Sequence, residues 1–370
     1  MIDNHCHPLL RDQDILDLET WRGFFTEGGA ALADHVPTTL FYRRAIRELS
    51  DLFGCDDNEN AVFRARQRMA PDALARRCLH DLTVLVLDTG YPPRDEAMTA
   101  EEMASLTGAR VAPLLRLEVL FEDSIAVSGN VGDLVSAVEA ALADIRAAGW
   151  VGLKSIAAYR GGLVISRPES GEVEEAFQAA RQNVEREGRL RLGYRPLHHF
   201  LLHVAFRAAA AQEVPVQFHT GYGDTDADLL LANPLHLRAI LEDPAYRAMP
   251  VVLLHESYPY TREGGYLAAV YPQVYLDLSY AIPFLSYQAM EAFTREALGV
   301  APLSKLLYAS DAVNLPELYW LSVRDGRRIL ADALAETARD GEQSGRDADG
   351  ALEDITGGNA RRLYGLQAEL

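Results

Sequence analysis

Two histidines, His5 and His7, stand two residues apart in the opening segment Met-Ile-Asp-Asn-His-Cys-His. This segment is typical of a short strand, in which side chains at positions i and i+2 point to the same side. Neutral imidazole is the commonest protein ligand for zinc and similar ions, so the two rings can reach one metal ion. A His-x-His pair also occurs without any role, so the interpretation depends on ligands from elsewhere in the chain.

Further ionisable residues stand at the ends of later apolar runs. Three such runs finish in His219, His255 and Asp311, and Lys154 lies within a fourth. A buried charge without a partner is costly, so these residues would be unfavourable as plain core. A bound cation would satisfy them together.

The elements that must position these residues follow one repeated pattern, a short apolar run, a polar loop and a stretch of helical spacing. Alternating strands and helices imply parallel pairing with right-handed crossovers, and eight such units favour an α/β fold of the closed (β/α)8 TIM-barrel type. The active site of such a barrel lies at the carboxyl ends of the strands. The predicted strands are Met1–His7, Thr83–Tyr91, Val111–Glu118, Val151–Arg160, Val214–Gly221, Pro250–Ser257, Val274–Tyr280 and Lys305–Ala312.

One connection is too long for a minimal barrel. Residues 8–82 separate the first two predicted strands and show helical character over 41–53, 59–69 and 72–80. A connection of this length is usually an inserted subdomain or a lid over the site. We therefore expect residues 1–370 to form a single barrel domain with a helical insertion at 8–82, which we call the insertion.

Two other stretches are predicted to be irregular. A long loop is expected over 159–195, after the fourth strand, and a mobile acidic connector over 341–350. A last helix is expected at 359–365.

Composition excludes several classes of partner. The formal net charge of −19 over 370 residues opposes binding to nucleic acid or to an anionic membrane. The three cysteines are odd in number and lack Cys-x-x-Cys spacing, which disfavours a disulfide framework and a cysteine-rich zinc module. Neither a signal peptide nor a membrane-length apolar run is evident, so a cytoplasmic location is the default expectation. The sequence allows a homo-oligomer but does not specify one.

The ligand order resembles that of the amidohydrolase superfamily: His-x-His on strand one, His on strands five and six, and Asp on strand eight. The segments His219–Asp224, Tyr258–Glu263 and Pro316–Trp320, with Asn233-Pro234, look like the amidohydrolase domain that some proteins carry fused to a glutamine-synthetase-like part. The resemblance covers the amidohydrolase domain alone.

The resemblance implies a role for each ligand. His5, His7, His219 and Asp311 would hold a divalent ion, most simply zinc, with manganese or iron as alternatives, and leave a position for water. Asp311 would accept a proton from the attacking water and pass it to the leaving nitrogen. His255 would either bind a second ion or orient the water and stabilise the oxyanion.

Lys154 is one of only two lysines in an arginine-rich chain, the other being Lys305. In binuclear members of the superfamily a carboxylated lysine on strand four bridges two ions, and the Gly-Leu-Lys segment ending at Lys154 resembles that setting. The alternative is a lysine that pairs with a substrate carboxylate or a buried acid beside a single ion. The number of ions, one or two, stays open.

Residues in the loops after the strands are candidates for substrate binding. Arg160 could grip a carboxylate with its planar fork, and Asp224 or Glu256 could pair an ammonium group. Tyr222 and Tyr258 stand in the same loops. Together they would suit a small amino-acid-like amide, such as a γ-glutamyl amide. The alternative is that the arginines make structural salt bridges in an acidic protein.

The predicted function is metal-dependent hydrolysis of a C–N bond in such a small-molecule substrate. A decarboxylase or lactonase of the same superfamily, acting on a small carboxylic acid, is the alternative enzyme. A non-catalytic scaffold is the third hypothesis, and the complete set of His5, His7 and Asp311 argues against it. The closely spaced His198, His199 and His203 are interpreted as ordinary residues of a helix outside the barrel, because the spacing lacks the glutamate of a helical zinc motif.

Overall fold

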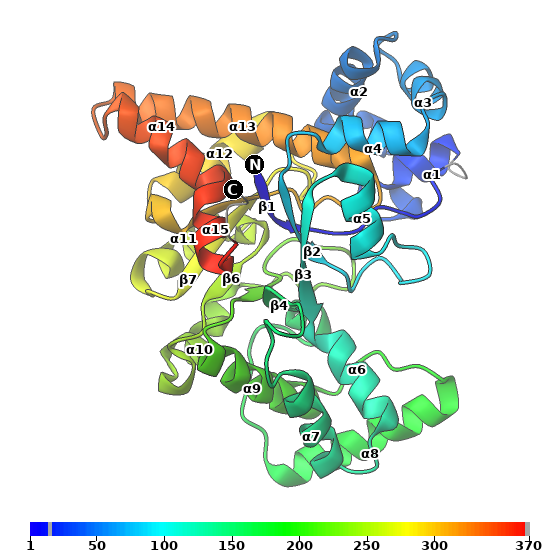
Figure 1. Cartoon of the computed structure of the whole chain (residues 1–370), viewed down its shortest axis with the longest axis vertical. Coiled ribbons are helices and arrows are strands. Elements are labelled where there is room, and N and C mark those ends of the chain that lie inside the picture. The colour runs from blue at the N-terminus through cyan, green and yellow to red at the C-terminus, as the bar shows by residue number, and fades with distance from the viewer. Residues whose placement is uncertain (14–16, 367–370) are drawn as a thin grey trace. The chain divides into compact units, whose positions relative to one another are not determined.

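The computed structural model describes residues 1–13 and 17–366; residues 14–16, within the predicted insertion, and 367–370 lie outside the described part. The described residues form eight strands in one sheet, in the order β1 to β8 (Figure 1). They are β1 (Ile2–Cys6), β2 (Val84–Asp88), β3 (Arg110–Arg116), β4 (Gly152–Ser155), β5 (Val216–Phe218), β6 (Val251–Leu253), β7 (Val274–Ser279) and β8 (Leu306–Ala309). Consecutive parallel strands confirm the predicted (β/α)8 barrel.

Helices alternate with these strands. They are α1 (Leu18–Gly23), α2 (Leu40–Phe53), α3 (Glu59–Gln67), α4 (Pro71–Leu79), α5 (Ala100–Thr107), α6 (Leu117–Val127), α7 (Val131–Ala141), α8 (Ser170–Glu187), α9 (Arg195–Gln212), α10 (Arg238–Glu242), α11 (Thr261–Val270), α12 (Tyr287–Leu298), α13 (Pro316–Arg339), α14 (Gly345–Glu353) and α15 (Asn359–Tyr364). None of them, within the described residues, is both long enough and apolar enough to cross a membrane.

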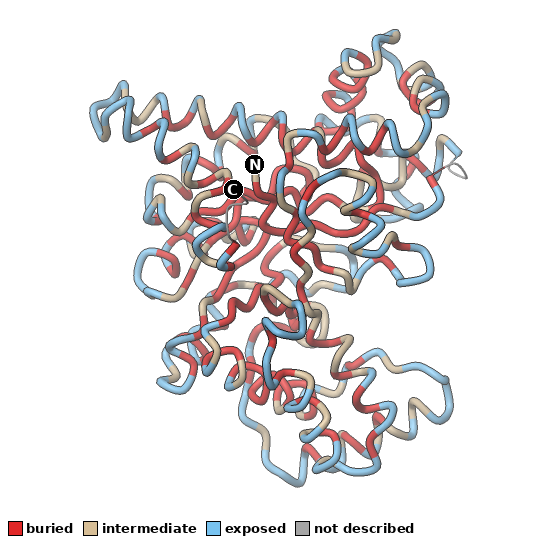
Figure 2. Tube along the Cα trace, viewed as in Figure 1, coloured by how far each residue is buried: buried red, intermediate tan, exposed pale blue. Residues whose placement is uncertain are grey.

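The chain packs as two compact units. The first contains residues 1–112, 223–225 and 277–362, and the second contains 113–222, 226–276 and the described residues from 363 on. Most strand residues other than those of β3 are buried, and exposed residues lie mainly on helices and loops (Figure 2).

In the first unit, β1 lies between β2 and the segment that follows β8. The amide of Asp311 donates to the carbonyl of His5 (2.9 Å), and the amide of Ser310 donates to the carboxylate of Asp3 (2.9 Å). Burial raises the pKa of Asp3 to about 7, against the hydrogen bonds from Ser310 and His5. The ends of the first and last strands are thereby held together.

The insertion contributes α1 to α4 to the first unit (Figure 1). Helix α2 begins where the Thr39 side chain accepts from the Tyr42 amide, and it ends at Gly54, which has the left-handed φ of 66°. Such a cap and a glycine just past the last turn are typical helix boundaries. The insertion has its own aromatic core: the rings of Trp21 and Phe25 lie 4.9 Å apart, and those of Phe25 and Tyr42 5.2 Å apart.

In the second unit, β4, β5 and β6 run in register, with Ser155, Phe218 and Leu253 side by side. Every residue of these three short strands is buried. This places the chain segments after Ser155, Phe218 and Leu253 next to one another, which is where the sequence places Arg160, His219 and His255.

Two predicted irregular stretches are helical instead. The loop expected over 159–195 contains α8, and the connector expected over 341–350 contains most of α14. Both predictions were wrong for one reason: these helices bury few side chains, only Val173, Phe177 and Ala180 in α8, so their apolar stripe is narrow. Their caps carried the signal, since Glu169 and Glu172 form a capping box at the start of α8 and Ser344 and Asp347 form one at α14.

Candidate metal centre

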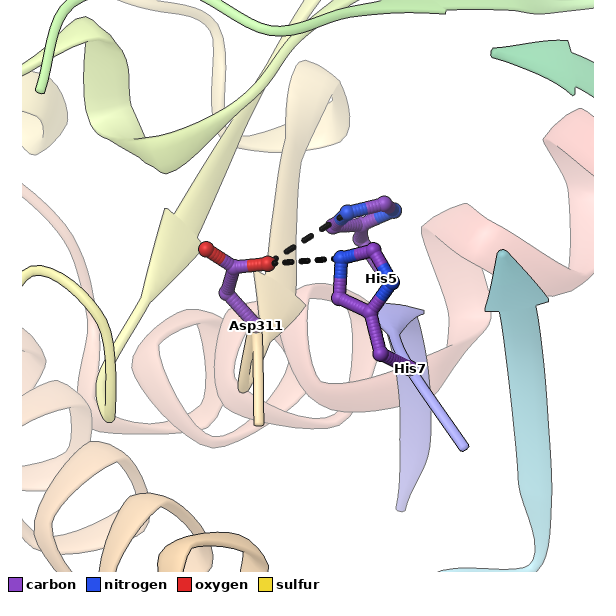
Figure 3. A group of neighbouring side chains, drawn as sticks. All are labelled: His5, His7 and Asp311. Atoms are coloured by element: carbon purple, nitrogen blue, oxygen red, sulfur yellow. Dashed lines mark ion pairs between the residues drawn. The ribbon is translucent and has the colours of Figure 1, made fainter. Parts of the chain in front are cut away.

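His5, His7 and Asp311 come together in the first unit (Figure 3). Nε2 of His5 and Nε2 of His7 each lie 3.4 Å from Oδ1 of Asp311, and all three side chains are buried. The two histidines project from the end of β1 to the same side, as the i, i+2 spacing predicts. Asp311 stands two residues past β8.

The ring of His7 is oriented by main-chain carbonyl groups. Its Nδ1 lies 3.3 Å from the carbonyl oxygen of Asp88 and 3.2 Å from that of Tyr91. Carbonyl oxygens only accept, so Nδ1 carries a proton, and Nε2, on the side of Asp311, is the nitrogen that could bind an ion. The hydroxyl of Tyr319 also donates to the carbonyl of His7.

This donor set fits a divalent transition metal. Two ligand atoms about 2.0 to 2.2 Å from one ion at tetrahedral angles lie roughly 3.3 to 3.6 Å apart, which agrees with the 3.4 Å separations. Two imidazole nitrogens and one carboxylate oxygen are donors that zinc, iron and manganese accept. Within the described residues no other group of three histidine, cysteine or acidic side chains has this geometry.

His219 and His255 come together in the second unit. Nε2 of His255 lies 2.9 Å from Nδ1 of His219, and the ring of Tyr159 lies 4.4 Å from that of His219. One of the two nitrogens must donate and the other accept, so two neutral rings here share one tautomer, with both protons on Nε2 or both on Nδ1.

His255 belongs to a strained turn after β6. Three consecutive residues have a left-handed backbone: His255 (φ 61°), Glu256 (φ 42°) and Ser257 (φ 55°). Such conformations persist only where the surroundings hold them, and they cluster at functional sites. Here the hydroxyl of Thr220 contacts that of Ser257 at 2.9 Å and donates to the carbonyl of Leu254.

The same turn requires glycine at position 221. Gly221 has φ 71°, and a Cβ there would lie 2.2 Å from the carbonyl oxygen of Tyr258. The amide of the next residue, Tyr222, donates to that carbonyl at 2.7 Å. The chain after β5 therefore lies directly on the chain after β6.

The other predicted site residues have varied surroundings. Lys154 lies on β4 and is 1% exposed, so it is not a surface cation. Arg160 lies 3.8 Å from Glu122, and burial lowers the pKa of Arg160. Glu256 is fully buried, and Asp224 is exposed.

The tyrosines of these loops are half-buried. The rings of Tyr222 and Tyr258 lie 6.5 Å apart, edge to face.

The structure adds residues that the sequence did not indicate. In the second unit Glu118, fully buried at the start of α6, accepts from the hydroxyl of Ser155 (2.8 Å) and lies 3.1 Å from Nε2 of His198. Burial opposes ionisation, but the hydrogen bond and charge of His198, together with hydrogen bonds from Ile156 and Ser155, lower the pKa of Glu118. The strand carrying Lys154 is thus anchored by a buried Glu–His pair.

The neighbouring helix histidines are held by hydrogen bonds. Nδ1 of His203 lies 2.7 Å from the hydroxyl of Tyr246, and the amide of Ser166 donates to Nδ1 of His199. All are buried within the second unit rather than on an outer surface. Burial lowers the pKa of His199 to about 4, so this histidine is neutral near pH 7.

In the first unit the sequence did not indicate Glu27, a residue of the insertion. Burial, and then the negative charges of Asp311 and Asp224, raise the pKa of Glu27 to about 7. The insertion therefore brings a carboxyl group near the candidate ligand Asp311. No short-range motif marks this residue, which follows two phenylalanines in a polar turn.

A comparison with protein families assigns the class. The sequence model of the amidohydrolase family matches residues 2–366. The chain therefore belongs to the amidohydrolase family, a class of metal-dependent enzymes, and the resemblance noted in the sequence is confirmed.

Individual relatives are consistent with this assignment. The chain is 31% identical to the protein fluG of Emericella nidulans over 409 aligned positions, covering all of this chain and 46% of the relative, so it spans about half the length of that protein. It is 29% identical to a proposed metal-dependent hydrolase from Lactobacillus casei, with a TM-score of 0.87 over 100% of this chain and 96% of that one.

A more distant structure shares the fold alone. The uronate isomerase of Thermotoga maritima matches with a TM-score of 0.68 at 13% identity, over 98% of this chain and 94% of that one.

Proposed function

We propose that this protein hydrolyses a C–N bond in a small, polar, amino-acid-like amide, such as a γ-glutamyl amide, with a divalent ion held by His5, His7 and Asp311. The observation that carries the proposal is the arrangement of these three donors, with the Nδ1 proton of His7 held by carbonyl oxygens. Zinc is the ion that we expect, since the donors are two imidazoles and one carboxylate.

The ligand order of the amidohydrolase family suggests further ligands. On that basis we propose that His219 is a fourth ligand of the ion. His255, which is hydrogen-bonded to His219, would orient the water or stabilise the oxyanion, or bind a second ion. Lys154, buried on β4, would either be carboxylated between two ions or remain an amine beside one.

The chemistry divides between the ion and the protein. A bound divalent ion lowers the pKa of water and polarises a carbonyl group. Asp311 would accept a proton from the water as its oxygen attacks the amide carbon, and return it to the nitrogen as the C–N bond breaks. Arg160 would bind the carboxylate of the substrate and Asp224 or Glu256 its ammonium group, with Tyr222 and Tyr258 as further substrate-binding residues.

Metal analysis followed by turnover assays tests the proposal. Purified protein should contain one or two divalent ions per chain and release glutamate from γ-glutamyl amides. His7→Ala and Asp311→Asn should lose most of the metal and at least a hundredfold in kcat/KM. The exposed His80 and Asp72 supply matched controls, His80→Ala and Asp72→Asn, which should behave as the unmodified protein.

The substrate panel decides between reaction classes. It should include γ-glutamyl amides, amides without an amino group, lactones and small carboxylic acids. A metal-loaded protein that opens lactones or releases carbon dioxide but leaves every amide intact would overturn the amide proposal and favour the alternative. Density beyond the Lys154 amine between two ions would establish the carbamate.

A further inference from the structure

Two segments of the first unit leave the ligand-bearing strands side by side. One runs from His7 to Leu10 and the other from Asp311 to Asn314. The amide of His7 donates to the carbonyl of Ala312 (2.9 Å), the amide of Asn314 to that of Pro8 (3.2 Å), and the amide of Leu10 to that of Asn314 (3.1 Å). The position of Asp311 relative to His7 therefore depends on how these segments pair.

The second of these segments is strained at both ends. Asp311 has φ 51° and Asn314 has φ 67°, in the left-handed region that side chains other than glycine rarely adopt. Asparagine and aspartate tolerate this region better than most residues, but they keep it only where neighbouring groups hold them. The ligand Asp311 is thus presented by a backbone that needs support.

The side chain of Gln13 supplies that support. Its Nε2 donates to the carbonyl of Asn314 (2.6 Å) and to that of Leu10 (3.0 Å), so one amide joins both segments. Gln13 is 5% exposed, which leaves little competition from water.

An arginine of the insertion fixes the orientation of that amide. Nη2 of Arg66 donates to Oε1 of Gln13 (2.5 Å), and Nη1 donates to the carbonyl of the same residue (3.2 Å). Arginine has no acceptor, so the amide oxygen must face Arg66 and the amide nitrogen must face Asn314 and Leu10.

Arg66 is in turn held by helix α13. Its Nε lies 2.5 Å from Oε1 of Glu317, in the first turn of α13, and Nε1 of Trp21 donates to the same oxygen at 3.2 Å. Arg66 and Glu317 are 4% and 0% exposed at their side chains. Removing one partner of a buried ion pair is strongly destabilising, because it leaves the other charge buried without a partner. Glu317 therefore holds Arg66 in place.

We infer that Gln13 and Arg66 are positioning residues of the metal centre: the insertion, through the Arg66–Gln13 contact, holds the strained segment that presents Asp311. Neither residue touches the predicted ligands, and their effect passes through the backbone of Asn314. This inference requires metal binding by His5, His7 and Asp311 but no particular substrate or reaction.

The test uses cobalt as a spectroscopic probe of ligand geometry. Gln13→Met keeps the size of the side chain and removes both donors and the acceptor; Arg66→Lys keeps the charge and removes the two-nitrogen grip on Gln13. We expect the dissociation constant for Co²⁺ to rise about tenfold or more, in the range seen when groups behind metal ligands are removed. The visible absorption of the Co²⁺ protein should change in shape and intensity.

Two matched controls separate this effect from general destabilisation. Gln178 and Arg76 are exposed and pair with neighbours one helical turn away, so Gln178→Met and Arg76→Lys should leave affinity and spectrum unchanged. Measurements are made at a temperature where each variant is folded by circular dichroism. A residue that only stabilises the fold would lower the melting temperature of the metal-free protein and leave affinity and spectrum as they were.

Gln13→Glu is a second, more conservative variant, which is used if Gln13→Met does not fold. It keeps an acceptor for Arg66 and removes both donors to Asn314 and Leu10, so it should reproduce the loss of affinity. Folded Gln13 variants that bind Co²⁺ within twofold of the unmodified protein, with the same spectrum, would overturn the inference. Failure of amide hydrolysis with normal metal binding would instead concern the proposed function alone.

Discussion

At the scale of single residues, the candidate centre depends on groups held in costly states. Asp311 and the turn at His255 have left-handed backbones, and Asp3 and Glu27 have carboxyl groups whose pKa burial raises to about 7. For Asp3, a hydrogen bond from the amide of Ser310 compensates part of this cost. We therefore expect substitutions here to change the free energy of unfolding measurably. Removing an unfavourable charge should stabilise the protein, and adding a steric clash should destabilise it.

Glu27→Gln should stabilise the metal-free protein at pH 8 more than at pH 5. The pKa of Glu27 is raised from 4.5 to about 7, so between these values the unfolded chain has released a proton that the folded protein retains. The free energy of unfolding therefore falls as pH rises through this window, and glutamine removes the loss. We expect a gain of about 2 kcal/mol at pH 8.

Urea unfolding in the presence of a chelator, at both pH values, measures this difference. Glu19→Gln, an exposed change in the nearby helix α1, is the control and should have no effect. An equal gain at pH 5 and pH 8 would contradict the role assigned to the charge of Glu27.

Gly221→Ala should destabilise the protein strongly. The added Cβ would lie 2.2 Å from the Tyr258 carbonyl oxygen, in addition to the strain of φ 71°. Gly188 has nearly the same φ, 69°, with open space around it. Gly188→Ala therefore measures the cost of the left-handed backbone alone, without a steric clash.

We expect a loss of about 1 kcal/mol at Gly188 and of about 3 kcal/mol or more at Gly221, both measured by chemical denaturation. Equal losses would show that the close approach of the two chain segments after β5 and β6 is not maintained in solution.

At the scale of elements, the sequence predicted the strands well because each is a short, mostly apolar run between longer stretches of helical spacing. The cluster of His5, His7 and Asp311, the candidate metal ligands, was predictable because the residue type and its place at a strand end are both local. By contrast α8 and α14 bury too few side chains to show helical periodicity, although their capping boxes were readable.

Contacts between distant segments were not predictable from local patterns. Arg66 and Gln13 are 53 positions apart, and Glu118 and His198 are 80 apart. Nothing in the residue types or spacing of these pairs distinguishes them from the many arginines, glutamines and histidines elsewhere, because each depends on tertiary packing.

The insertion should lose its packing as a unit when its aromatic core is opened. Phe25 is 1% exposed between Trp21 and Tyr42, so Phe25→Ala should cost about 3 to 5 kcal/mol locally. We expect faster amide hydrogen exchange throughout α1, α2 and α3, while β1 and β8 keep their protection.

Leu40→Ala, at a side chain that is 65% exposed, is the matched control and should leave exchange unchanged. If exchange in β1 and β8 accelerates together with the insertion, the insertion and these strands unfold as one cooperative unit.

At the scale of the whole molecule, the net charge of −19 favours approach of a divalent cation and disfavours approach of anionic ligands. If the substrate is an anion, as proposed above, its binding therefore needs local positive charge, such as that of a bound divalent ion. The same charge makes metal binding sensitive to ionic strength, because exposed charges are screened within about 10 Å at 0.1 M salt.

Metal removal should lower the stability of the whole protein, because His5 and Asp311 lie about three hundred positions apart and one ion would join the first strand to the last. An ion present at about a thousand times its dissociation constant stabilises the folded state by about 4 kcal/mol, which for a chain of this size corresponds to about 5 °C in melting temperature. We expect Zn²⁺ to raise the melting temperature of the metal-free protein by this amount and a chelator to reverse it. His7→Ala and Asp311→Asn should show no shift and His80→Ala the full shift; equal shifts in all three would mean that the ion binds elsewhere in the molecule.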